Sequence, residues 1–186
     1  WEKHYPGMVE WLGPKIHDGL KSVDPKTGTV VTGFETYKAA LVNVIPAQMA
    51  GWIAREAGLA NATGFCPIDP KNMQSAMDPN IYVLGDASIA GDMPKSAFAA
   101  NSQAKVAANA IRGELTSSRV FPAKYTNTCW SLIETDDAVK VGGAYEPKDG
   151  KITALETYIS KTGESADLRK ATQAENMGWY AGIVAD

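Results

Sequence analysis

Two short apolar runs, each bounded by residues that interrupt regular structure, constrain the fold of this chain more than any other feature. The first covers residues 39–45 (AALVNVI) and stops at Pro46, and the second covers residues 81–84 (IYVL) and stops at Gly85. Runs of about four to eight aliphatic and β-branched residues are typical of strands that are covered on both faces, as in parallel sheets. The sequence therefore predicts an α/β fold with buried parallel strands.

The remaining apolar residues recur at helical or strand spacing. Helices are expected over residues 48–57 and about 96–112, because apolar positions repeat there every three or four residues and Gly58 and Gly113 follow. The turn-rich first 34 residues predict two short strands, and the stretch after about residue 116 predicts an antiparallel meander followed by a helix. The expected strands are 8–12 and 29–32 in the first part and 130–133, 139–145 and 152–159 in the meander, and the last helix is expected at about 165–184.

Composition and charge exclude several classes of protein. With 45% hydrophobic and 21% charged residues among 186, the chain has the composition of an ordinary globular protein. No apolar run approaches the roughly 18 residues of a membrane-spanning helix. Its 18 basic and 21 acidic residues are mixed along the chain, so no cluster of basic residues indicates nucleic-acid binding. The two cysteines show no metal-ligand spacing, so a small molecule or another protein is the expected partner.

The segment after the second apolar run has features of a ligand site. Gly85 lets the backbone pass close to a ligand at the carboxyl end of a strand, and Asp86 places there an acceptor for sugar-like hydroxyls. The helix that begins near residues 94–96 offers unpaired N–H groups and the positive end of its dipole to an electron-rich group. The alternative is an ordinary strand, turn and capped helix.

Three stretches give the chain a family resemblance. The run IYVLGDASIAGDMPKSAFAANSQAKVAANAI (81–111), the upstream FCPIDPKNMQSAMDPN (65–80) and the downstream NTCWS (127–131) resemble the flavoprotein subunit of flavocytochrome c sulfide dehydrogenase. That subunit is one of the flavoproteins with two dinucleotide domains, which include sulfide:quinone oxidoreductases. The similarity extends from about residue 41 to 131 and recurs weakly near Trp179. It implies that this chain corresponds to the carboxyl-terminal half of such a subunit.

The resemblance implies FAD as the cofactor. By it, Asp86 holds the ribityl chain, Gly85 gives that chain room, and the helix beginning near residue 96 faces the pyrimidine side of the flavin, where reduced flavin carries negative charge. The alternatives are a surface position for Asn101 and Gln103 and a solvated charge for Lys95. The candidate flavin-binding residues are Gly85, Asp86, Lys95, Ser96, Asn101 and Gln103.

Cys129 resembles one of the two redox-active cysteines beside the flavin in this family. A disulfide accepts attack by sulfide, and the released thiolate can pass electrons to the flavin. The alternative is a small buried hydrophobic residue. The resemblance places the partner cysteine in the preceding half of the subunit and makes Cys66 a buried structural thiol, although a Cys66–Cys129 disulfide is a second possibility. Trp179 aligns with a tryptophan near the flavin; its alternative role is core packing against Tyr180 and Ile183.

The domain organisation follows from the same resemblance. Residues 1–35 are expected to be the tail of a second nucleotide-type domain, 36–115 the carboxyl-terminal part of a Rossmann-like FAD domain, and 116–186 an α+β interface domain. The chain begins with Trp1, has no signal-peptide features in its first residues, and contains no G-x-G-x-x-G after a predicted strand. We therefore expect a piece of a longer protein, inactive and weak in FAD binding on its own.

The expected function is that of the parent enzyme. The resemblance implies a periplasmic, FAD-dependent sulfide dehydrogenase that passes electrons to a c-type cytochrome subunit. A sulfide:quinone oxidoreductase is the first alternative, disfavoured by the mixed polar tail KATQAENMGWYAGIVAD. The second alternative is a non-catalytic module that docks a cytochrome.

Overall fold

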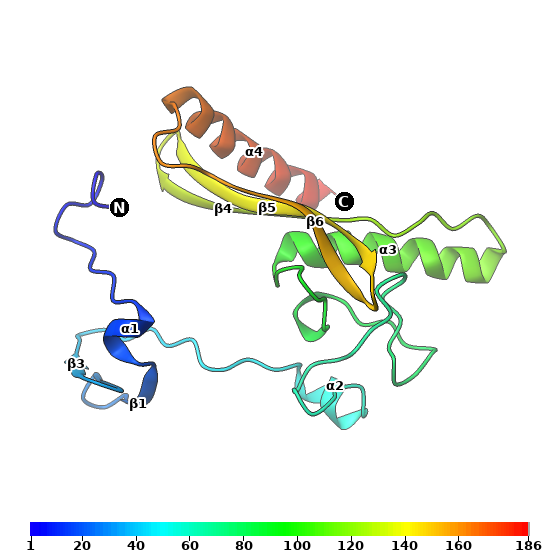
Figure 1. Ribbon diagram of the computed structural model, residues 1–186, viewed down its shortest axis with the longest axis horizontal. Coiled ribbons are helices and arrows are strands. Elements are labelled where there is room, and N and C mark those ends of the chain that lie inside the picture. Colours follow the sequence, from blue (N-terminus) through cyan, green and yellow to red (C-terminus); the bar gives the residue numbers. More distant parts are fainter. Residues whose placement is uncertain (186) are drawn as a thin grey trace. The chain divides into compact units, whose positions relative to one another are not determined.

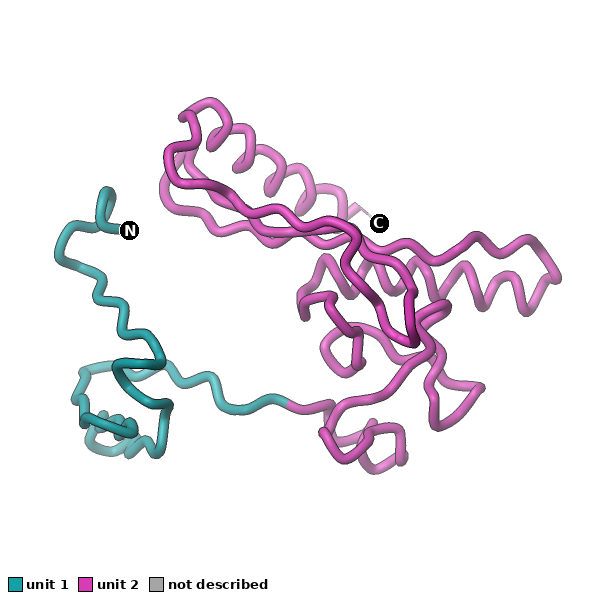
Figure 2. The backbone as a smooth tube through the Cα atoms, viewed as in Figure 1, with its two compact units in different colours: residues 1–48 teal, residues 49–186 magenta. Residues whose placement is uncertain are grey.

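The computed structural model describes residues 1–185, whose helices and strands are shown in Figure 1. The chain divides into two compact units, residues 1–48 and 49–186 (Figure 2). The first unit combines one short helix with a three-stranded antiparallel sheet, and the second combines several helices with another such sheet. The expected mixture of helix and sheet is therefore confirmed.

The first unit is built on a small meander. A one-turn helix, α1 (Pro14–His17), precedes strands β1 (Leu20–Asp24), β2 (Thr29–Thr32) and β3 (Thr36–Lys38), which pair in that order. The Asp24 carboxylate closes the β1–β2 turn, accepting from the Lys26 N–H at 2.9 Å and the Thr27 hydroxyl at 2.7 Å. The strand expected at 29–32 is confirmed, whereas residues 8–12 form none.

The first apolar run does not form the predicted buried strand. Residues 39–45 have no strand partner in the part of the chain that the structure describes, and Leu41 and Ile45 are 86% and 83% exposed. A strand needs neighbours that take up its backbone hydrogen bonds and cover its side chains. The composition of this run indicates burial, but nothing in the first unit supplies the flanking strands.

The second apolar run is likewise not a regular strand. The second unit begins with helix α2 (Trp52–Glu56), shorter than the expected 48–57, and continues as a long irregular segment. Residues 81–84 make one antiparallel bridge, from Tyr82 to Gln74, and a parallel bridge joins Cys66 to Ser88. The Rossmann-like parallel sheet is therefore not present within residues 1–185.

Helix α3 (Ala97–Thr116) confirms the alanine-rich helix but passes its predicted end at Gly113. It terminates instead at Ser117, which adopts a left-handed conformation with φ 54°. Gly113 is buried, and a Cβ there would collide with the side chain of Val120 on the returning chain. The glycine therefore permits close packing inside the helix.

The predicted carboxyl-terminal meander is confirmed. Strands β4 (Tyr125–Glu134), β5 (Asp137–Lys148) and β6 (Lys151–Ile159) pair in order, and helix α4 (Ala166–Ala185) runs along the sheet (Figure 1). The main core joins this sheet to α3 and to the irregular segment. Its buried members include Met73, Met93, Tyr125, Tyr145 and Ile152.

None of the helices within residues 1–185 combines the length and apolar character that crossing a membrane requires.

Candidate functional site

The amino end of helix α3 is the structural base of the candidate site. Ser96 is the N-cap, and its Oγ accepts from the Ala99 N–H at 3.0 Å. The N–H groups of Ala97 and Phe98 meet no acceptor within residues 1–185. These free donors and the helix dipole give this end a local positive potential.

Gln103 and Lys95 hold the Gly85–Asp86 turn, here a 3₁₀ turn named η1 (Gly85–Ala87), against this helix. Gln103 is 1% exposed; its Oε1 accepts from the Gly85 N–H at 2.6 Å and its Nε2 donates to the Met93 sulfur at 3.5 Å. Its surface alternative is therefore wrong. Because both ends of its amide bind protein groups, Gln103 supports the turn.

Lys95 is also more than a solvated charge. Its ammonium donates to the Asp86 carbonyl and to the Ser88 carbonyl at 3.0 Å, and it lies 4.2 Å from the centre of the Phe65 ring. Partial burial lowers the pKa of Lys95, while the negative charge of Asp86 opposes that change. These contacts join the Gly85–Asp86 turn to the residues that immediately precede helix α3.

Gly85 and Asp86 leave open the side of the turn that a ligand would use. Gly85 has φ +69°, a conformation that glycine adopts without strain, and a Cβ there would lie 3.4 Å from the Ala100 methyl group. The Asp86 side chain is exposed, and its carboxylate accepts no hydrogen bond from residues 1–185. A free carboxylate of this kind can accept hydroxyl donors.

Cys129 is tied to the same helix end through Asn127. The Ser96 hydroxyl donates to Asn127 Oδ1 at 2.5 Å, and Asn127 Nδ2 donates to Cys129 Sγ at 3.5 Å. Cys129 is half-buried, and Asn127 is 1% exposed. The sequence interpretation assigned no role to Asn127, although strand alternation puts residues 127 and 129 on one face of a sheet and could have indicated the pairing.

The two cysteines have different environments. Both are free thiols, so the Cys66–Cys129 disulfide is not formed. Cys66 is completely buried, and burial raises its pKa while the Lys95 charge opposes the increase. These properties match the structural thiol expected for Cys66.

Trp179 belongs to an aromatic cluster that joins three elements. Its ring stacks on Phe98 of α3 with centroids 5.5 Å apart, and Trp130 of β4 lies 5.9 Å from Trp179 and 6.0 Å from Phe98. These partners differ from the expected Tyr180 and Ile183. Trp179 and Asn101 also line one groove of about 210 Å³ with Lys105, Gly182 and Ile183. The structure thus brings two predicted site residues together.

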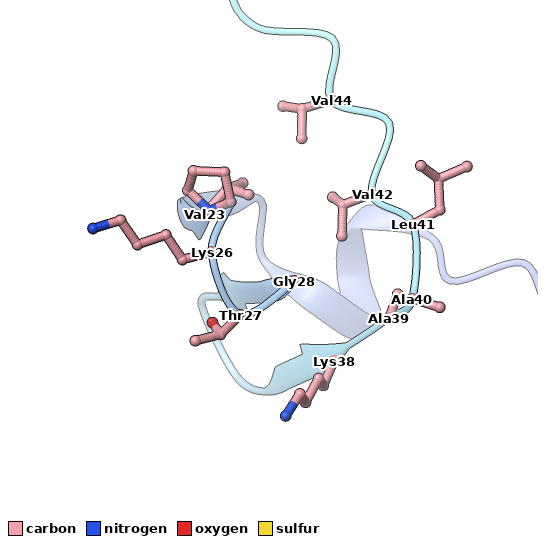
Figure 3. A pocket seen from close by; sticks show the side chains of 11 residues that line it. Val23, Lys26, Thr27, Gly28, Lys38, Ala39, Ala40, Leu41, Val42 and Val44 are labelled. Carbon is pink, nitrogen blue, oxygen red and sulfur yellow. The ribbon is translucent and has the colours of Figure 1, made fainter.

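The first unit carries a hollow of about 660 Å³, and no His, Cys, Asp or Glu is among the residues that line it. Valine and alanine side chains and the β1–β2 turn surround it, and Figure 3 shows Lys26 and Lys38 directed away from Val42 and Val44. In residues 1–185, no three or more His, Cys, Asp or Glu side chains gather where they could hold a metal ion. The chemistry-bearing groups are therefore those around α3 and β4.

Comparison with solved structures shows a shared fold. A chain of the Tetrahymena thermophila mitochondrial ATP synthase, from the cryo-EM F1Fo composite tetramer, superposes with a TM-score of 0.61 over 85% of this chain, at 17% identity. This chain spans 39% of the length of that chain. At this identity the likeness concerns the fold alone.

Two family models match the sequence. The model described as "Flavocytochrome c sulphide dehydrogenase, flavin-binding" matches residues 122–186. The model described as "Sulfide dehydrogenase (flavocytochrome c) flavoprotein chain, central" matches residues 1–46. Both descriptions name flavocytochrome c sulfide dehydrogenase. The chain belongs to the family of flavocytochrome c sulfide dehydrogenase flavoproteins.

Proposed function

We propose that this chain is the carboxyl-terminal part of an FAD-dependent sulfide dehydrogenase in which Cys129 is one of two redox-active cysteines. One observation carries the proposal: Asn127 and Ser96 link the Cys129 sulfur to the amino end of α3, the same end that Gln103 and Lys95 join to the Gly85–Asp86 turn. A sulfur nucleophile and the groups suited to a flavin are thus parts of one hydrogen-bonded assembly.

The residues present fit a flavin. The free Asp86 carboxylate is suited to the ribityl hydroxyls, and Gly85 presents no side chain to them. The unpaired N–H groups of Ala97 and Phe98 suit the electron-rich pyrimidine edge. When bound, a flavin supplies a two-electron acceptor that can release electrons singly. FAD is the proposed form.

The cysteine chemistry is thiol–disulfide exchange. In the oxidised parent, Cys129 forms a disulfide with a cysteine outside these residues. Hydrosulfide attacks one sulfur of this disulfide; a new S–S bond forms to give a cysteine persulfide, and the protein S–S bond breaks to release the other cysteine as a thiolate. The electron pair supplied by sulfide is then held in the persulfide and thiolate, beside the flavin site. A c-type cytochrome subunit is the proposed final acceptor, and the periplasm is the proposed location.

The domain organisation expected from the sequence extends this proposal to the parent. Residues 1–35 would close a second nucleotide-type domain, 36–115 complete the FAD domain, and 116–186 form the interface domain. The exposed side chains of Leu41 and Ile45 support it, because strands of the parent would cover them.

Two alternatives share parts of this assembly. A sulfide:quinone oxidoreductase would use the same cysteine chemistry but would dock on a membrane. Helix α4 has a mixed surface, with Asp167, Arg169 and Lys170 in its first turns and exposed Met177, Tyr180 and Val184 near its end, and this mixture favours membrane docking less than a continuous apolar face would. A non-catalytic cytochrome-docking module would need no reactive sulfur.

The deciding experiment replaces Cys129 by serine in the full-length flavoprotein with its partner subunit. Sulfide is added without oxygen, and flavin reduction is followed by visible absorbance. We expect Cys129→Ser to retain flavin and lose sulfide-dependent reduction, while Cys66→Ala retains both. Unchanged reduction in Cys129→Ser would refute the redox role and favour the docking module.

A further inference from the structure

We propose that Asn127 is the positioning residue of the reactive sulfur: it holds and activates Cys129 by donating an amide N–H to Sγ, while the N-cap serine of α3 fixes its orientation. This inference rests on the proposed redox role of Cys129 and adds the group that controls it. Asn127 acts through Cys129 and needs no contact with sulfide or flavin.

Both ends of the Asn127 amide interact with the sulfur. Ser96 Oγ accepts from the Ala99 N–H, so its own proton is available and is donated to Asn127 Oδ1 at 2.5 Å. Asn127 Nδ2 donates to Cys129 Sγ at 3.5 Å, and the Cys129 thiol donates to Oδ1 at 3.9 Å. The cap of helix α3 therefore holds the amide that faces the sulfur.

Burial makes this arrangement specific. Asn127 is 1% exposed, so its amide cannot exchange these partners for bulk water. An N–H donated to sulfur favours the thiolate over the thiol, because a hydrogen bond to the charged form stabilises that form. The thiolate is the species that attacks disulfides and persulfides. Asn127 therefore presents a hydrogen-bond donor to the sulfur that reacts.

The other titratable groups near Cys129 are either uncharged near pH 7 or lie on the opposite face of the sheet. Tyr145 of β5 interacts with Cys129, but burial and the Cys129 charge raise the pKa of Tyr145, so it is neutral near pH 7. Tyr158 of β6 exchanges a hydrogen bond with Thr128. Lys140, paired with Glu175, is opposite Trp130 in the sheet and thus on the other face from Cys129. From α3, the uncharged Ser96 makes the contact.

The test measures the reactivity of Cys129 in the full-length, reduced flavoprotein. Iodoacetamide alkylation is followed at a series of pH values, and the Cys129 peptide is quantified by mass spectrometry. We expect Asn127→Leu, which removes the donor without adding charge, to slow the alkylation of Cys129 at neutral pH by about tenfold. Asn109→Leu is the matched control, since it removes an amide donor from the same helix system without contacting Cys129.

A second variant guards against a folding defect in Asn127→Leu. Ser96→Ala leaves the Asn127 amide in place but frees its orientation, and we expect a smaller decrease in the alkylation rate of Cys129. An alkylation rate of Cys129 that is unchanged in folded Ser96→Ala and Asn127→Leu proteins overturns the positioning role, even if Cys129→Ser abolishes sulfide oxidation. Slower alkylation together with normal sulfide oxidation by Cys129→Ser overturns the proposed function and leaves the positioning contact standing.

Discussion

Replacing Gln103 by leucine removes the acceptor that holds the Gly85–Asp86 turn on helix α3. Leucine fills a volume similar to that of the glutamine side chain, so the 1% exposed site stays packed. The Gly85 N–H loses its 2.6 Å partner, and the Met93 sulfur loses a weak donor. The substitution therefore tests one hydrogen bond and the turn that depends on it.

The expected loss of stability follows from that unpaired donor. A buried N–H left without a partner costs about 1–3 kcal/mol. Because Gly85 is half-buried, we expect the lower part of that range, about 1–2 kcal/mol. In a domain of this size each kcal/mol changes the melting temperature by about 2–4 °C. Flavin affinity should fall as well, since the freed turn no longer presents the Asp86 carboxylate in one position.

Thermal unfolding and flavin release from the full-length protein measure both effects. Gln48→Leu makes the same change at an exposed position, where Nε2 donates to the nearby Pro46 carbonyl at 2.8 Å, and should alter stability by less than about 0.5 kcal/mol. If Gln103→Leu melts and releases flavin as Gln48→Leu does, the turn does not depend on Gln103. That result would refute the support role assigned to it.

Three further tests concern the second unit. The bond from the Lys151 ammonium, followed by that from a backbone N–H, holds the pKa of the Asp92 carboxyl below its usual 3.8. The stability that the ionised Asp92 contributes is complete above pH 3.8 and is lost as the pH falls through the lowered pKa. The urea midpoints of wild type and Asp92→Asn should therefore converge in acid; a difference between the midpoints that stays constant with pH would contradict this. Gly142→Ala would place a Cβ 2.5 Å from the Tyr158 hydroxyl and should cost about 1–3 kcal/mol by urea unfolding, whereas Gly178→Ala, in open space on α4, should gain about 0.5–1 kcal/mol. Arg169→Gln breaks a 2.5 Å ion pair with a side chain only 19% exposed and should speed hydrogen exchange in α4, while Lys170→Gln, whose pair is exposed, should change it little; equal effects would count against the difference in burial.

Local sequence patterns predicted the elements whose contacts join residues close together in the sequence. The meander of β4, β5 and β6 was predictable because alternating apolar residues and short turns specify pairing between consecutive strands. Helix α3 was predictable from its alanine spacing and its serine cap. Runs 39–45 and 81–84 were misassigned because a parallel strand depends on partners distant in sequence, which composition alone does not supply.

The sequence named candidate site residues one by one and gave none of the hydrogen bonds between them. It indicated Asp86, Ser96 and Cys129 as separate candidates. It named Gln103 as a flavin-binding candidate, and the structure adds that this side chain supports Gly85. Asn127 was missed because its role arises from two hydrogen bonds, one across the fold to Ser96 and one along β4 to Cys129. Such pairings follow from packing, which spacing along the chain does not reveal.

The oxidation state of Cys129 tests the central claim most directly. Peptide mass spectrometry under non-reducing conditions, on the full-length protein before and after one equivalent of sulfide without oxygen, reports it. The redox role predicts a disulfide between Cys129 and a cysteine other than Cys66 before sulfide, and a thiol or persulfide at Cys129 afterwards. A Cys129 that is a free thiol in the oxidised protein and stays unmodified through sulfide oxidation would contradict the account.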